Sequence, residues 1–98
     1  MYGETSNYQN GIGNRVTVLE AEDEIISIFC QNNGGMEFAM PIIRKQFNDA
    51  GIDFKNPTKD ELIVIVDKLV NITKELQGEA AAKEEFRDYM HIINKISD

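Results

Sequence analysis

This chain of 98 residues contains one cysteine, one histidine, two prolines and no tryptophan. Cys30 has no second cysteine to pair with, so the fold has to be held together by packing, and we expect a reducing, cytoplasmic environment. One cysteine and one histidine are too few for the usual zinc site. We therefore expect neither a metal nor a cofactor.

The chain also lacks a long hydrophobic run. No stretch approaches the roughly 20 apolar residues that a membrane-spanning helix needs. The first 15 residues have neither the basic start nor the apolar centre of a secretory signal. We therefore expect no association with a membrane.

Positive charge is scarce as well. The sequence has 17 acidic and 10 basic residues, a net charge of −7, which repels nucleic acid and anionic lipid. A local basic patch could consist of Arg44, Lys45, Lys55 and Lys59, although acidic residues interrupt it. This patch supports an alternative hypothesis, a helix-turn-helix-like regulator that binds nucleic acid, but the linker after residue 50 is long for that motif.

Residues 1–15 are rich in Gly, Asn, Ser and Tyr and poor in apolar residues, so we predict a flexible tail. Residues 16–98 carry the apolar periodicity and are predicted to form a single helical domain. No internal repeat divides this second segment.

The first helix is predicted to begin at Thr17. Thr17 and Glu20 have the spacing of a capping box, in which each side chain accepts a hydrogen bond from the other residue's backbone N–H. Residues 32–35, Asn-Asn-Gly-Gly, are expected to end this helix because Gly and Asn tolerate a positive φ. Its buried face should include Ile25, Ile28 and Phe29.

The second helix has two possible starting points. Pro41 is tolerated in a first helical turn but not deep inside a helix, so the helix starts near Met40 or, with a kink, near Met36. It ends at Gly51 in either case. Ile43 and Phe47 face the core in both alternatives.

The third helix, residues 58–77, is hydrophobic around nearly half its circumference. Its buried stripe is predicted to contain Leu62, Ile65, Val66, Leu69, Ile72, Thr73 and Leu76. A helix this apolar is packed by two or more neighbours, so we place it at the centre of the domain.

The fourth helix is predicted over residues 79–96. Its stripe consists of Ala82, Phe86, Tyr89, Met90, Ile93 and Ile96. The sequence as a whole therefore predicts an all-α fold, a compact four-helix domain with a flexible N-terminal tail and the third helix at its centre. Short connections favour antiparallel packing of the first helix with the second and of the third with the fourth.

Three apolar residues do not fit the predicted core. If the second helix starts at Met36, Phe38 and Ile42 point away from Ile43 and Phe47, and Val64 faces the polar side of the third helix. Exposed apolar clusters often mark protein-binding surfaces. We therefore predict that Phe38, Ile42 and Val64 are partner-binding residues, unless the 52–54 segment or the tail covers them.

His91 lies opposite the apolar stripe of the last helix, with Glu84 and Asp88 on a similar side. A carboxylate–histidine pair can act in acid–base catalysis, but only where a cleft excludes water. We expect these residues to form a solvated surface and the protein not to be an enzyme. The function favoured by the sequence is a non-enzymatic module that binds another protein or a second copy of itself.

Overall fold

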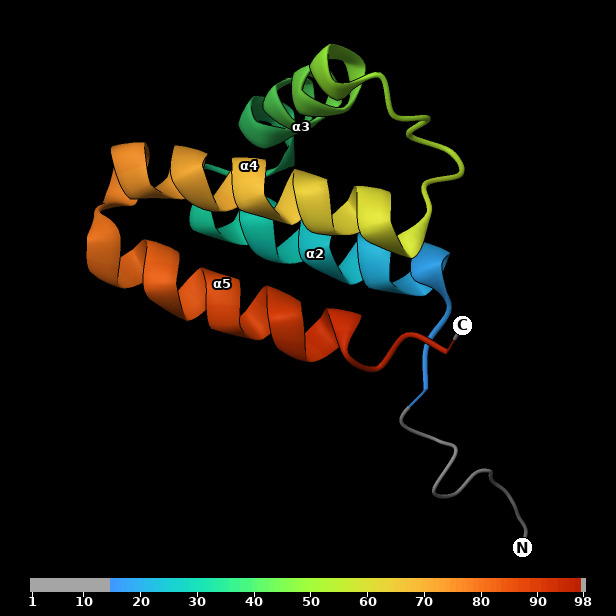
Figure 1. Ribbon diagram of the computed structural model, residues 1–98. Coiled ribbons are helices and arrows are strands. Elements are labelled where there is room, and N and C mark those ends of the chain that lie inside the picture. The colour runs from blue at the N-terminus through green and yellow to red at the C-terminus, as the bar shows by residue number, and fades with distance from the viewer. Residues whose placement is uncertain (1–14, 98) are drawn as a thin grey trace, which may run out of the picture.

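The computed structural model describes residues 15–97, which form four helices and no strand (Figure 1). In chain order the helices are α2 (Val18–Asn32), α3 (Met36–Ala50), α4 (Lys59–Gln77) and α5 (Glu79–Ile93). The predicted all-α, four-helix class is confirmed. The predicted tail over residues 1–15 lies outside the described residues except for its last residue, Arg15.

The predicted capping box at Thr17 is present, and a second one lies at the start of α4. The Thr17 hydroxyl accepts a hydrogen bond of 3.1 Å from the Glu20 backbone N–H, and the Glu20 carboxylate accepts one of 2.9 Å from the Thr17 backbone N–H. Thr58 and Glu61 make the same two hydrogen bonds at the start of α4. Each box satisfies two N–H groups that have no partner within the helix.

Helix α3 begins at Met36, the earlier of the two predicted starts, and contains Pro41 within it. Pro41 has no N–H to donate to the carbonyl of Glu37, but both residues are exposed, so water can satisfy that carbonyl. The buried face of α3 consists of Ala39, Ile43 and Phe47. This face agrees with the predicted one.

Helices α4 and α5 form an antiparallel hairpin joined at Gly78, as predicted (Figure 1). Gly78 has a φ of 101°, a conformation that side chains with a Cβ rarely adopt, and it allows α5 to start one residue after α4 ends. Helix α2 lies against both helices of the hairpin. Helix α4 contacts each of the other three helices, which confirms its central position, and α2 does the same.

The predicted antiparallel packing of the first two helices is wrong. Figure 1 shows α2 lying across the view, whereas α3 is seen more nearly end-on and crosses above α2 and α4. The physical reason lies in the connection between them. Gly34 and Gly35 both have a positive φ, of 93° and 91°, and two such residues in succession turn the chain out of the plane of a simple hairpin.

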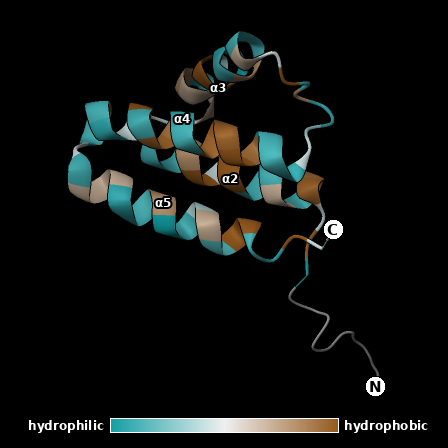
Figure 2. Ribbon diagram, in the orientation of Figure 1, coloured by the Kyte–Doolittle hydropathy of each residue, from teal (hydrophilic) through white to brown (hydrophobic). Residues whose placement is uncertain are grey.

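Most of the predicted core is buried. Leu62, Ile65, Val66 and Leu69 have no exposed surface, and Figure 2 shows hydrophobic residues along α4. Leu76 at the end of the predicted stripe is 50% exposed. The stripe therefore stops before the last turn of α4, where the neighbouring helices no longer cover it.

The buried face of α5 agrees only in part with the predicted one. Ala82, Tyr89 and Ile93 are buried as predicted, but Phe86 is 46% exposed and Glu85, at 1% exposure, takes its place. A buried carboxylate is costly unless it is hydrogen bonded. The partners that make this burial possible come from other helices and are described below.

The two ends of the described chain are joined by a short parallel bridge. The Val16 backbone N–H donates a hydrogen bond of 3.0 Å to the Lys95 carbonyl, and the Ser97 N–H donates one of 3.0 Å to the Val16 carbonyl. Helix α5 therefore ends at Ile93 and not at Ile96. Ile96 is still buried, because the bridge holds it against the core.

Candidate interaction surface

Two of the three predicted partner-binding residues are exposed and one is half-buried. Phe38 is 56% exposed and Val64 is 45% exposed, but Ile42 is half-buried and packs against the core. The hollow that Phe38 lines contains neither Ile42 nor Val64. Phe38 thus remains as a candidate, and its neighbours differ from those predicted.

A hollow of about 410 Å³ lies where the start of α3 meets the end of α4. Phe38 and Leu76 line it together with Asn33, Gly34 and Gln77. Phe38 comes from the first turn of α3 and Leu76 from the last turn of α4, so the hollow is created by the crossing of these two helices. We call Phe38, Leu76 and this hollow the Phe38–Leu76 surface.

A buried network of polar side chains lies directly behind the Phe38–Leu76 surface. The Asn33 amide donates hydrogen bonds of 3.0 Å to the Phe29 carbonyl and 3.0 Å to the Thr73 hydroxyl. The Thr73 hydroxyl donates a hydrogen bond of 2.8 Å to Glu85, and the Asn32 amide donates another of 2.8 Å to the same carboxylate. This polar network connects α2, α4 and α5. It also holds Asn33, which lines the hollow, in position.

The polar network was missed by reasoning from the sequence. Asn33 is predicted only to help end the first helix, and Glu85 is absent from the predicted stripe of the fourth helix. The available signal was the spacing 82, 85, 89, 92, 93, 96, which fits one helix face as well as the predicted stripe does. Only the partners on α2 and α4 distinguish the two faces.

Tyr89 lies in the core beside this network. Its hydroxyl is buried and has no hydrogen-bond partner within residues 15–97. Burial, together with the nearby negative charge of Glu85, raises the pKa of Tyr89 far above its ordinary value. The phenol therefore stays neutral at physiological pH.

Glu22 is a second buried carboxyl group, 5% exposed, on the side of α2 that faces the linker between α3 and α4. Burial is the main cause that raises the pKa of Glu22 from 4.5 to about 7, and the charges of Asp23 and Asp53 add to it. One of its carboxylate oxygens has no hydrogen-bond partner among the described residues. Glu22 thus titrates near neutral pH, but it lines none of the hollows described here.

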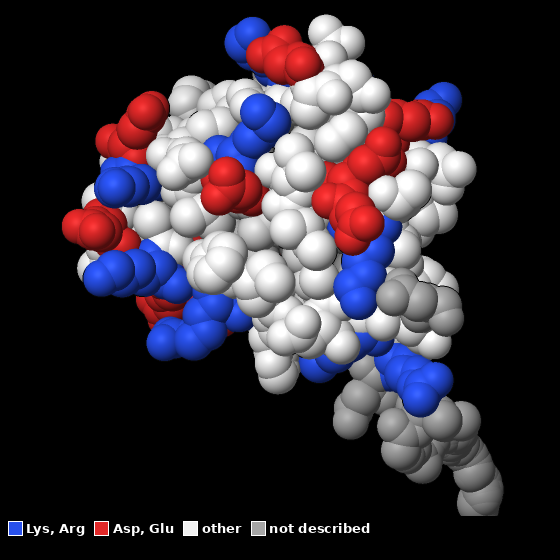
Figure 3. Space-filling view, in the orientation of Figure 1, with Lys and Arg blue, Asp and Glu red and all other residues white. Residues whose placement is uncertain are grey.

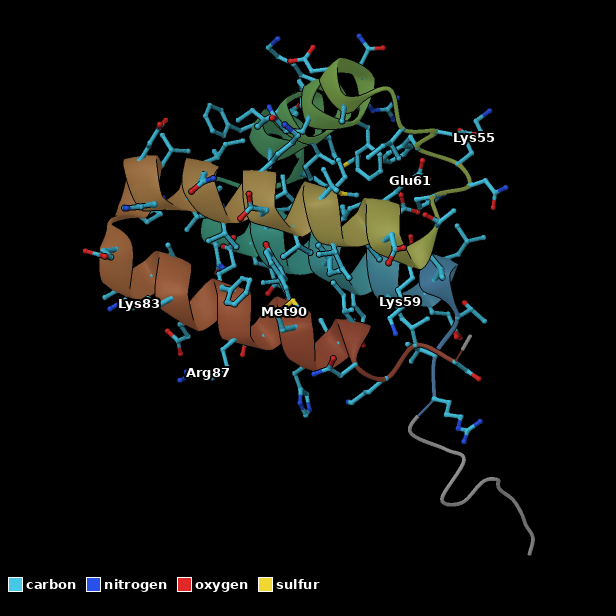
Figure 4. The ribbon with its side chains drawn as sticks, in the orientation of Figure 1. Lys55, Lys59, Glu61, Lys83, Arg87 and Met90 are labelled. Carbon is cyan, nitrogen blue, oxygen red and sulfur yellow. The ribbon has the colours of Figure 1, made fainter. Side chains whose placement is uncertain are left out.

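The four predicted basic residues do not form a continuous patch. Arg44 lies over the Phe54 ring, 5.5 Å from its centroid, and Lys45 forms a salt bridge of 2.9 Å with Asp49. Both line a hollow of about 640 Å³ that also contains Asp49 and Asp53. Lys55 lies in the linker before α4, and Lys59, the first residue of α4, lies on another side of the helix (Figure 4). The space-filling view likewise shows Lys and Arg interspersed with Asp and Glu (Figure 3).

Glu84, Asp88 and His91 line a groove between α2 and α5. Glu84 and Asp88 line a hollow of about 430 Å³, and Asp88 and His91 line a second one of about 470 Å³. All three side chains are exposed, as predicted. The structure therefore brings the three side chains to one groove that is open to water.

Cys30 is buried, and burial raises the pKa of its thiol. It lines an apolar hollow of about 460 Å³ with Ile26 and Met36, between α2 and the start of α3. A thiol with a raised pKa is a poor nucleophile, because the reactive species is the thiolate. Cys30 therefore acts here as a small apolar wall residue.

Within residues 15–97, no group of three or more His, Cys, Asp and Glu side chains is placed to hold a metal ion. None of the helices described here has the length and apolar character needed to cross a bilayer. No family model matches the chain, and no curated protein or solved structure matches it either.

Proposed function

We propose that this chain is a non-enzymatic helical module that acts by binding another protein chain, which can be a second copy of itself, through the Phe38–Leu76 surface. One observation carries the proposal. Phe38 and Leu76, which are 56% and 50% exposed, line the same hollow although they come from different helices. Single exposed apolar residues are ordinary, but two large ones around a concavity are typical of a binding site.

The wall behind this surface supports the proposal as well. Asn33 lines the hollow and is held by hydrogen bonds to Phe29 and Thr73. A wall held in this way keeps its shape before a partner arrives, so less entropy is lost on binding. An apolar side chain of the partner would lie between Phe38 and Leu76.

The proposed site of action is the cytoplasm. Cys30 is a free thiol, and the described residues are held together by packing and hydrogen bonds. A chain of this kind does not need an oxidising compartment to fold.

The alternative function, binding of nucleic acid, gains no support from the geometry, because Asp49 and Asp53 line the same hollow as Arg44 and Lys45.

Site-specific photo-crosslinking tests the proposal. A benzophenone amino acid replaces Phe38 in one variant and Phe86 in a control variant. Phe86 is a suitable control because it is also an exposed phenylalanine on a helix, at 46% exposure, but it does not line the hollow. Both variants are irradiated as purified protein and in extract of the native host.

We expect discrete covalent adducts from position 38 and few or none from position 86. An adduct of twice the mass of the chain in the purified sample identifies self-association, and a different mass in extract identifies another partner. Equal adduct patterns at both positions, or none at either, contradict the proposal.

A further inference from the structure

The two hollows between α2 and α5 form one continuous groove. Ile28, Gln31 and Asp88 line both of them, so the hollows meet at these residues. The two helices run in opposite directions in Figure 1, and the groove follows them from Ala81 to Lys95. We call this feature the α2–α5 groove.

Four of the thirteen residues that line the α2–α5 groove are acidic, and one, Lys95, is a lysine. Glu24, Glu84 and Asp88 are exposed along it, and none of them forms an ion pair with another residue of the range 15–97. Glu85 also contributes to the lining, although it is 1% exposed. Its two oxygens accept hydrogen bonds from the Asn32 amide and the Thr73 hydroxyl, and it forms no ion pair with another of those residues.

Two of the basic residues of α5 lie away from the groove. Lys83 and Arg87 line neither hollow, whereas His91 and, after the end of α5, Lys95 line one of them (Figure 4). Glu84 and Asp88 are four residues apart, so they project from the same side of α5, about 6 Å from each other. Basic residues spaced by three or four positions on a partner helix would match them.

The groove also offers apolar contact. Ile28 is half-buried at the junction of the two hollows, and Ile92 lines one of them at 7% exposure. A helix that docks in the groove needs an apolar stripe to contact such residues. It also needs polar residues beside that stripe to contact the exposed polar side chains of the groove. The α2–α5 groove therefore fits an amphipathic helix whose apolar stripe is flanked by Lys or Arg.

The α2–α5 groove and the Phe38–Leu76 surface share one residue, Gln77, which lines both. The polar network lies between them, with Asn33 at the Phe38–Leu76 surface and Asn32 and Glu85 at the groove. A single bound protein can thus contact the two surfaces together. This continuity links the groove to the proposed binding activity.

Charge decides between the possible occupants. A second copy of this chain carries a net charge of −7 and is repelled by an acidic groove, and nucleic acid is repelled for the same reason. A basic protein segment is attracted. We propose that the α2–α5 groove binds a basic amphipathic helix of a partner protein, an inference that rests on the proposed function and names the chemistry of its partner.

A peptide titration tests the inference. The probe is a synthetic amphipathic helix of about 15 residues, matched in length to the groove, with leucines along one face and lysines on both sides of it. It is titrated into the full-length, ¹⁵N-labelled chain, and the amide shifts are followed. We expect saturable shifts that centre on the groove residues Ser27, Gln31, Asp88 and His91.

Two variants with the same loss of charge provide the control. The variant E84Q/D88N removes two carboxylates from the groove, and D67N/E75Q removes two exposed carboxylates from α4 that do not line it. We expect binding to weaken about tenfold in the groove variant and less than about twofold in the control. All four substitutions are nearly isosteric and on exposed positions, so both variants should fold.

Equal weakening in the two variants would show nonspecific attraction and overturn the inference, as would shifts that centre elsewhere or no binding at all. The result is distinguishable from a failure of the proposed function. Crosslinking from position 38 without binding of the peptide in the groove retains the proposed function and removes only the basic partner.

Discussion

The hydroxyl of Thr73 on α4 donates a hydrogen bond of 2.8 Å to the carboxylate of Glu85 on α5, and both side chains are buried. The same hydroxyl accepts a hydrogen bond from Asn33 at the end of α2. One oxygen atom thus connects three helices. The position of the Phe38–Leu76 surface relative to the α2–α5 groove depends on this connection.

Replacing Thr73 with valine should destabilise the protein by about 2 kcal/mol, because the Asn33 amide and the Glu85 carboxylate each lose a buried partner. Valine has nearly the same shape as threonine, so little packing is lost. Urea unfolding followed by circular dichroism measures the change. T73S, which keeps the hydroxyl, should lie between the wild type and T73V, and a T73V variant as stable as the wild type contradicts the role assigned to the network.

Glu22 should make stability depend on pH. Its pKa is about 7 in the folded chain, against an ordinary value of 4.5. The folded state therefore holds a proton that the unfolded state has released, and the free energy of unfolding falls as pH rises through this window. We expect E22Q to be more stabilising at pH 8 than at pH 5, by about 1 kcal/mol after allowance for solvent screening.

Urea unfolding of E22Q at both pH values measures this difference. The exposed neighbour Glu24 provides the control, because E24Q changes the same functional group without burial. The same pH dependence in E22Q and E24Q would show that burial of Glu22 is not the cause.

Two variants, G34A and G35A, should distinguish the effect of backbone strain from the effect of a new contact between the added Cβ and the Phe38 ring. The two glycines have nearly the same φ, 93° and 91°, so both substitutions should destabilise the protein by about 1 kcal/mol or more. A Cβ at Gly34 would lie 3.2 Å from the Phe38 ring, whereas a Cβ at Gly35 would meet nothing within 4 Å. Only G34A should therefore move the ring.

The NMR signals of the Phe38 ring in G34A and G35A measure this effect. A shift in G34A alone supports the described position of Phe38 over Gly34. Similar ring shifts in both variants contradict that position, whatever the change in stability.

Duplex DNA should not bind the chain. Arg44 and Lys45 share their hollow with Asp49 and Asp53, and the chain as a whole has a net charge of −7. Fluorescence anisotropy with labelled DNA at low ionic strength tests this expectation, since contacts with phosphate are strongest there. Association that weakens steeply with added salt and is lost in R44A/K45A would restore the nucleic-acid hypothesis.

The sequence was sufficient to predict the helices, because their signals are local. Thr17 and Thr58 each lie three residues before a glutamate, and Gly51 and Gly78 follow the last helical residues. The apolar stripe of α4 was equally clear, since the burial of Leu62 and Leu69 follows from the helical period alone.

The binding surfaces were harder to predict because they depend on the way helices meet. The predicted stripe of the fourth helix contains Phe86 and omits Glu85, because it consists of apolar and aromatic residues. Thr73 and Asn32, which lie on other helices, make the burial of Glu85 possible because they donate hydrogen bonds to its carboxylate. In the same way, the sequence left open whether Phe38 is exposed, and Leu76, which lines the same hollow, could not be identified because the crossing of α3 over α4 brings it there.

The central claim, that a partner chain covers Phe38, is tested most directly by ¹⁹F NMR with 4-fluorophenylalanine at position 38 and, in a separate sample, at position 86. Both rings are about half exposed in the free chain. On raising the protein concentration or adding extract of the native host, the account predicts that the resonance at position 38 shifts or broadens while that at position 86 stays unchanged. Resonances that both stay unchanged, or that change together, contradict it.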